Sequence, residues 1–275
     1  MNDYLKKISR GSWHVSKRFL AEGCADRAAS LVYTTLLSLV PLSLVAFAIL
    51  SYIPWFHGVG AHIQDFVFDN FVTSSAQSLV DTFKNFMQAL PNLSKTNFIA
   101  LIIFSLLTIY NISSAFNAIW HVRKHRNIVW SFFIYLLILI LTPVLVGLGF
   151  VLSSLFISLP FISGGAHVPL VIQVLFWLTP YVLTFIAFTF LNWVLPTCKV
   201  SLYAAAIGGL VTSILFELAK MAFGYYLAYF SSYQILYGAL AIFPIFLVWL
   251  YISWIVILIG AMISHVVMTG VPKDV

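Results

Sequence analysis

Six apolar stretches, each long enough to cross a lipid bilayer, run through this chain of 275 residues. A transmembrane helix needs about 20 mostly apolar residues, because the hydrocarbon core of a bilayer is about 30 Å thick. Inside that core a chain segment must satisfy its own backbone hydrogen bonds, which favours helices. We therefore predict an all-α, polytopic membrane helix bundle with about six transmembrane helices, near Ala28–Ile53, Phe98–Trp120, Ile128–Ile157, Leu170–Val194, Ser201–Tyr229 and Gly238–Val267.

The composition agrees with a bilayer as the surrounding solvent. Hydrophobic residues make up 62% of the chain and charged residues 8%, whereas an ordinary soluble domain carries roughly 25% charged residues. A soluble protein this apolar would expose large apolar patches. The length suits one membrane domain, 1–275, and from the charged start of the chain we expect no cleavable signal peptide.

Lysine and arginine gather on one side of the predicted bundle. Eleven of them flank the helix ends on the side of the N-terminus, and two lie in the opposite loops. The positive-inside rule then places the N-terminus in the cytoplasm, and an even number of helices places the C-terminus there too. Cys24 and Cys198 fall on this reducing side, so we expect no disulfide between them.

The segment 1–27 has the pattern of a basic amphipathic helix on the inner leaflet. At about 100° per residue, Leu5, Ile8 and Phe19 share an apolar arc opposite the basic residues. Such a helix can serve lipid sensing or lipid handling, or it can be a plain positive-inside anchor. The predicted contacts to lipid headgroups are Lys6, Lys7, Arg10, Lys17 and Arg18, together with Arg123, Lys124 and Arg126 of a later cytoplasmic loop.

The external segment 54–97 is the one long loop of the predicted topology. Its apolar residues follow a helical period in two successive short stretches, which predicts two amphipathic helices. The part Phe71–Leu90 either covers the mouth of a cavity or packs on the outside of the bundle.

Glu217 and Lys220 lie well inside the fifth apolar stretch. Ionisable groups at bilayer depth are costly and usually face a bundle interior or a wet cavity. At a spacing of three residues they share a helix face and can pair. The pair is therefore a candidate substrate, ion or proton site, and the alternative is a structural pair that fixes helix packing.

Polar residues on other helices are candidates to complete that site. Interhelical hydrogen bonds explain each of them separately, and only convergence on Glu217 would indicate a shared site. The candidates are Asn111, Ser114 and Asn117 of the second stretch and Tyr33 and Ser38 of the first. Interior prolines, which kink helices, are expected at Pro41, Pro143, Pro180 and Pro244.

Several segments, in their order and spacing, resemble the YihY/virulence factor BrkB family of bacterial inner-membrane proteins. They are Ala28–Leu42, Phe116–Arg123, Leu195–Lys220, Tyr237–Ala241, Leu247–Ser253 and Leu258–Ala261. The resemblance covers nearly the whole chain. It implies a six-helix protein of the inner (plasma) membrane, of a family linked to envelope integrity and to lipid or ion transport, without agreed catalytic residues.

Members of that family were once labelled ribonuclease BN, and the residues of this chain do not support that label. A metal-dependent nuclease needs clustered histidines and carboxylates. His121 and His125 are one turn apart, but Arg123, Lys124 and Arg126 surround them and would repel a metal ion. We expect no catalytic residues, no metal, no cofactor and no nucleic-acid partner.

Three functions follow from the sequence. The first is a transporter-like protein that handles a lipid, an envelope solute or an ion through a cavity near the fifth helix. The second is a scaffold without transport that supports the envelope, and the third is an enzyme, either a membrane-bound ribonuclease or a lipid-modifying enzyme. Membrane lipids are the expected partners, and the substrate and the oligomeric state stay open.

Overall fold

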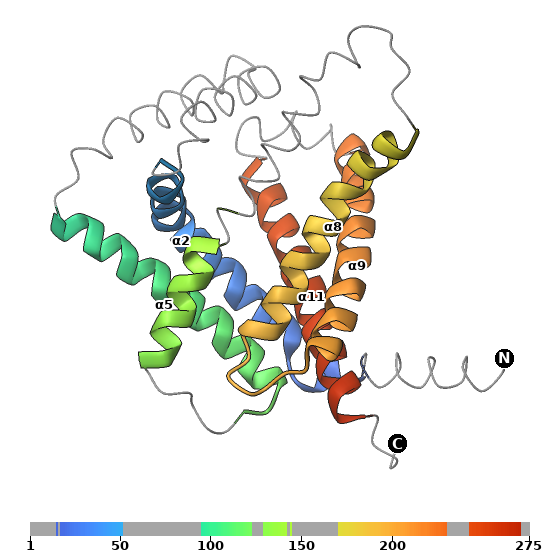
Figure 1. Cartoon of the computed structure of the whole chain (residues 1–275), viewed down its shortest axis with the longest axis horizontal. Coiled ribbons are helices and arrows are strands. Elements are labelled where there is room, and N and C mark those ends of the chain that lie inside the picture. Colours follow the sequence, from blue (N-terminus) through green and yellow to red (C-terminus); the bar gives the residue numbers. More distant parts are fainter. Residues whose placement is uncertain are drawn as a thin grey trace, which may run out of the picture. The chain divides into compact units, whose positions relative to one another are not determined.

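The computed structural model of the chain describes residues 15, 17–51, 95–122, 129–141, 144, 170–229 and 242–270. Within these ranges every regular element is a helix, which confirms the all-α fold class. The long helices, shown in Figure 1, are α2 (Cys24–Ser51), α5 (Lys95–Ile119), α8 (Leu170–Val194), α9 (Leu202–Tyr229) and α11 (Ile242–Thr269).

Three of the described helical stretches are long and apolar enough to cross a membrane by themselves. They are Ile99–Ile119, Leu202–Leu227 and Phe243–Thr269, and two shorter apolar helices cover Val129–Leu141 and Leu178–Val194. At 28 residues, α2 is about 42 Å long, which also exceeds the hydrocarbon core. The total of six spans stays a prediction, because most of Ile128–Ile157 lies outside the described residues.

Contacts group the chain into two compact units. The first unit consists of Met1–Leu36, Tyr110–Ile134 and Leu178–Val275, and the second of Leu37–Ile109 and Tyr135–Trp177. In the second unit, the hydroxyl groups of Ser105 and Thr108 are buried in α5 and donate to carbonyls one turn earlier. These buried hydroxyls are therefore satisfied within their own helix. The single membrane domain 1–275 stays a prediction.

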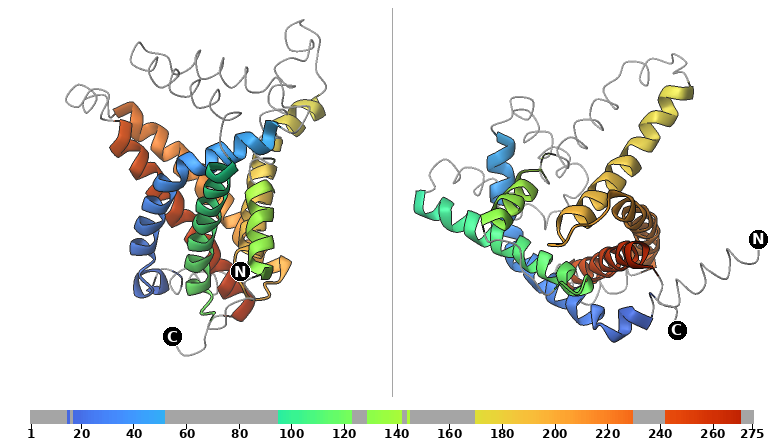
Figure 2. Two further views of the ribbon diagram at one scale, coloured as in Figure 1. Left: turned by 90° about the vertical axis from the view of Figure 1, so that its left-hand side faces the viewer. Right: turned by 60° about the horizontal axis from the view of Figure 1, so that its bottom comes forward.

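Small residues bring α9 and α11 close together in the first unit. A Cβ atom at Gly208 would lie 2.6 Å from the carbonyl oxygen of Gly260, and one at Gly260 would collide with the side chain of Thr212, so both positions need glycine. Ser264 of α11 donates a hydrogen bond of 3.1 Å to the carbonyl of Ala204 in α9. Small residues permit such close approach of helices in a membrane. Figures 1 and 2 show the two helices side by side from three directions.

The turn between α8 and α9 is held by α5. The hydroxyl of Ser113 donates to the carbonyl of Leu195 over 2.8 Å. The side-chain oxygen of Asn117 accepts hydrogen bonds from the backbone N–H of Thr197 at 2.7 Å and from its hydroxyl at 3.1 Å. These bonds tie the C-terminal part of α5 to the turn that follows α8 and precedes α9.

The prolines behave differently from one another. Pro41 lies inside α2 and Pro180 inside α8, as predicted. For Pro244 an interior position stays a prediction, because residues 238–241 of the expected span lie outside the described residues. Pro244 is the third residue of α11 within its described bounds. Pro143 lies outside the described residues.

Two predicted segments fall largely on residues that the structure does not describe. The external loop 54–97 is described only from residue 95, where α5 begins, so the role of Phe71–Leu90 stays a prediction. Of the segment 1–27, a helical stretch through residues 17–21 is described, followed by a turn at Glu22 and Gly23 and then by α2.

Candidate functional site

Glu217 and Lys220 form an ion pair on α9. The Lys220 Nζ atom lies 2.6 Å from Glu217 Oε1. Glu217 is about 22 Å along the helix axis from the start at Leu202, at about 1.5 Å per residue. The pair therefore lies deep within a stretch that is apolar enough to span a membrane.

The surroundings of the pair are aromatic on one side and open on the other. The ammonium of Lys220 lies 5.7 Å from the ring centroid of Phe216, within the range of a cation–π contact. The Phe216 ring contacts Trp249 of α11, with 5.6 Å between centroids. The Lys220 side chain is 45% exposed and that of Glu217 is 22% exposed, and the neighbouring Leu218 faces outward as well.

The predicted polar partners of the pair lie elsewhere or face outward. Asn117 binds Thr197 in the turn after α8. Asn111 and Ser114 are exposed, and Tyr33 is 66% exposed. Ser38 is buried and belongs to the second unit. The structure thus describes Asn117 as part of a structural contact, and the site role of all five residues stays a prediction.

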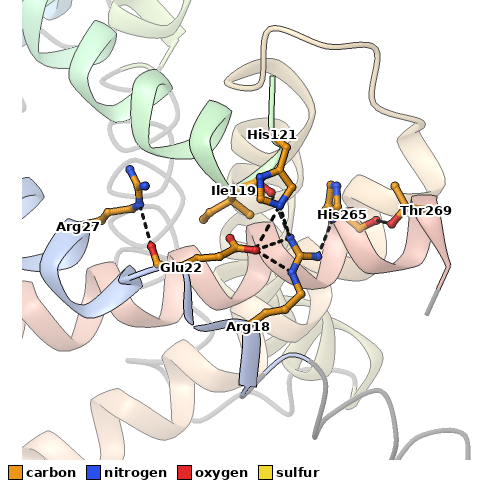
Figure 3. A network of polar contacts seen from close by, with 7 residues as sticks. All are labelled: Arg18, Glu22, Arg27, Ile119, His121, His265 and Thr269. Carbon is orange, nitrogen blue, oxygen red and sulfur yellow. Dashed lines mark hydrogen bonds and ion pairs between the residues drawn. The ribbon is translucent and has the colours of Figure 1, made fainter. Parts of the chain in front are cut away.

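A second set of polar residues, separate from the predicted site at Glu217, lies in the first unit. These residues come from the segment before α2, the end of α5 and the last turns of α11. We call Arg18, Glu22, His121 and His265 the polar cluster, which Figure 3 shows. Glu22 Oε1 accepts a hydrogen bond of 2.8 Å from Arg18 Nε and lies 2.6 Å from Nη2. Arg18 Nη1 donates over 2.9 Å to Nδ1 of His265. The cluster thus joins residues before α2 to the last turns of α11.

His121 has two alternative partners in the polar cluster. Its Nε2 atom lies 3.1 Å from Arg18 Nη2 and 3.3 Å from Glu22 Oε1. Arginine only donates and a carboxylate only accepts. A neutral His121 with a bare Nε2 therefore accepts from Arg18, whereas an Nε2 that carries a proton donates to Glu22.

The backbone of His121 is also unusual, with a φ of 50°. His121 follows the end of α5, where its N–H donates to the carbonyl of Ala118 and the next N–H, of Val122, donates to Asn117. This pair of bonds is a Schellman motif, which normally places glycine in the left-handed position. A histidine there costs backbone energy, and the fold retains it where its imidazole reaches Arg18 and Glu22.

The side chains of Arg18 and Glu22 are 17% and 16% exposed. Among the described residues, the Oε2 atom of Glu22 is buried without a hydrogen-bond partner. The guanidinium of Arg18 is thus directed into the protein, while Lys17 is exposed. Headgroup contact stays a prediction for both residues. The other predicted contacts, Lys6, Lys7, Arg10, Arg123, Lys124 and Arg126, lie outside the described residues.

Sequence reasoning missed Glu22 and His265 as partners of Arg18. Arg18 and Glu22 are four residues apart, a spacing at which helical ion pairs form, so this contact could have been predicted from the sequence. His265 is 247 positions from Arg18, and no local sequence pattern predicts their contact. Within the described ranges, no group of three or more histidine, cysteine or acidic residues could hold a metal ion.

Comparison with known proteins identifies the family of the chain. The virulence factor BrkB family matches residues 15–272. A UPF0761 membrane protein of Coxiella burnetii (strain Dugway 5J108-111) is 46% identical over 260 residues, which is 94% of each chain. A UPF0761 membrane protein of Pseudomonas paraeruginosa is 39% identical over 249 residues, 90% of this chain and 60% of that relative. No solved structure matches this chain. The matched span and these identities show that the chain belongs to the virulence factor BrkB family of membrane proteins.

Proposed function

We propose that this chain is a transporter-like protein that moves lipids between the leaflets of a bacterial inner membrane. The ion pair of Glu217 and Lys220 on α9 is the polar site that binds the lipid headgroup while it crosses the apolar core. The single observation that carries the proposal is a charged pair, partly exposed, deep within an apolar spanning helix.

The Glu217–Lys220 pair lowers the stability of the folded bundle in the membrane. Each charged side chain near the centre of a transmembrane helix costs about 2.5–3.5 kcal/mol on insertion scales. Replacing a buried ion pair by apolar residues is often neutral or stabilising. Stability of the bundle therefore gives little reason to keep Glu217 and Lys220, whereas a binding role does.

The exposure of the pair favours a lipid over a solute that arrives from water. Lys220 is 45% exposed, and Leu218 beside it is exposed too. A ligand within the bilayer reaches such a lateral position directly. An enclosed cavity, which the sequence predicted near this helix, is not required for that access.

Purified protein in liposomes tests the proposal. The probes are phospholipids with a fluorescent acyl chain, and their transfer between leaflets is followed by extraction into albumin. For phosphatidylethanolamine probes we expect transfer well above that of protein-free liposomes and strong loss of it in Glu217→Gln and in Lys220→Met. The matched controls are Asp26→Asn and Lys199→Met, which remove exposed charges outside the apolar spans.

The alternatives have their own outcomes in the same vesicles. A dye for protons or monovalent cations inside the liposomes reports ion movement, and ion movement without lipid transfer would replace the proposal by ion transport. Absence of both would leave a scaffold role, and full lipid transfer in both variants would remove the pair from the mechanism.

A further inference from the structure

We infer that the Glu217–Lys220 pair binds a zwitterionic phospholipid headgroup, which carries one phosphate and one ammonium group. The inference rests on the proposed function and names its substrate class. The phosphate pairs with the ammonium of Lys220, and the ammonium of the headgroup pairs with the carboxylate of Glu217.

The geometry places both required charges on one turn of one helix. Lys220 Nζ is 2.6 Å from Glu217 Oε1, so a headgroup that reaches one of these side chains reaches the other. The pair is partly exposed, and both side chains start from the same face of α9 because they are three residues apart. A headgroup with two opposite charges close together matches this arrangement.

Charge balance selects against ligands with a single charge. An anionic headgroup that draws Lys220 away leaves Glu217 unpaired inside an apolar span, and a cation that binds Glu217 leaves Lys220 unpaired. A lone charge at that depth is expensive. A zwitterionic headgroup exchanges partners with both residues at once, so no charge is left without a counter-ion at any stage of binding.

The aromatic side chains beside the pair favour a headgroup that contains an ammonium group. The ring of Phe216 already lies 5.7 Å from an ammonium, that of Lys220. Phe216 is held in place by Trp249, which in turn contacts Phe223 with 4.9 Å between ring centroids. When the headgroup ammonium takes the place of Lys220 beside Glu217, it meets the same ring face. A glycerol headgroup gains no such contact.

Headgroup selectivity in proteoliposomes tests the inference without any variant. The probes are acyl-labelled phosphatidylethanolamine, phosphatidylcholine and phosphatidylglycerol, each added as a trace to the same host lipid. We expect the two zwitterionic probes to transfer at least about tenfold faster than phosphatidylglycerol, since an unpaired charge in the span costs at least that factor. Equal rates for all three would overturn the inference and leave the proposed function standing. Transfer of none would reject the proposed function itself.

Variants of the pair should change the order of the three transfer rates, which a purely structural role of the pair would leave unchanged. Glu217→Gln leaves Lys220 as a lone cation, so phosphatidylglycerol should become the fastest of the three probes. The exchanged pair, Glu217→Lys with Lys220→Glu, keeps both charges and should keep the zwitterionic preference. Lys199→Met, at an exposed position outside the span, should keep both rate and preference. An unchanged order of rates in Glu217→Gln would overturn the inference.

Discussion

The guanidinium of Arg18 lies 2.9 Å from the imidazole Nδ1 of His265, although 247 positions separate the two residues. Because arginine cannot accept a hydrogen bond, Nδ1 of His265 is the acceptor, which places the proton of a neutral His265 on Nε2. The contact holds the segment before α2 to the last turns of α11.

Removing Arg18 should loosen the segment that precedes α2. Arg18→Ala removes both arginine contacts of Glu22 Oε1 and leaves it His121, while Oε2 already lacks a partner among the described residues. The loss of charged hydrogen bonds should lower the free energy of unfolding by about 2 kcal/mol. Hydrogen exchange at residues 17–23 should rise in parallel. Lys17→Ala, at an exposed neighbour, is the control, and equal behaviour of the two variants would contradict this account of the polar cluster.

Two substitutions at His121 separate backbone strain from side-chain contacts. Glycine and alanine both remove the imidazole, but only glycine adopts a φ of 50° without a penalty. We expect His121→Gly to be more stable than His121→Ala by about 1 kcal/mol. The measurement is denaturant unfolding of the two purified variants in the same detergent. If alanine proved as stable as glycine, the left-handed position would not be strained.

Glycine positions on α9 should respond according to what surrounds them. A Cβ atom at Gly208 would lie 2.6 Å from the carbonyl oxygen of Gly260, whereas one at Gly224 would meet nothing within 4 Å. Gly208→Ala should destabilise the protein by about 1–3 kcal/mol, the usual cost of overpacking. Gly224→Ala should be neutral or slightly stabilising, since alanine favours a helix. Thermal unfolding in detergent compares them, and a tolerated Gly208→Ala would contradict the close α9–α11 contact.

The two cysteines should differ in reactivity. Cys24 is fully buried and precedes the predicted span that begins at Ala28, and burial, followed by the nearby carboxylate of Glu22, raises the pKa of its thiol. A raised pKa means less thiolate at neutral pH, and the thiolate is the form that reacts. Cys198 is partly exposed. A membrane-impermeant maleimide should therefore label Cys198 and spare Cys24.

The same labelling reports the predicted orientation. In spheroplasts with an intact inner membrane, the reagent should label neither cysteine. Permeabilising that membrane should make Cys198 accessible to the reagent. Labelling of Cys198 from outside would place the turn between α8 and α9 on the external side and reverse the predicted topology.

The positions of the helices could be predicted because span length is a property of the bilayer. The expected Ser201–Tyr229 compares with the observed Leu202–Tyr229, and the expected Gly238–Val267 with Ile242–Thr269. Residues 238–241 of the latter span lie outside the described residues, so its start and the position of Pro244 within it stay predictions. An apolar run does not by itself reveal where within it a helix begins.

The candidate sites were predictable only where they are local. Glu217 and Lys220 share a helix face by spacing alone, and the structure brings their charges together. The polar cluster depends on the ends of α5 and α11 meeting the residues before α2, which no local pattern contains. The backbone of His121 is equally hidden, since the residue type does not indicate a positive φ.

The most direct test of the central claim is lipid transfer by the protein that lacks both charges of the pair. The double variant Glu217→Gln with Lys220→Met removes the intramembrane charges and leaves no unpaired one, so the fold should be at least as stable as that of the natural chain. We expect its thermal stability to be unchanged or higher while the transfer of acyl-labelled phosphatidylethanolamine in proteoliposomes falls to the rate of protein-free vesicles. Transfer at the rate of the natural chain would contradict the account and make the pair a structural feature of α9.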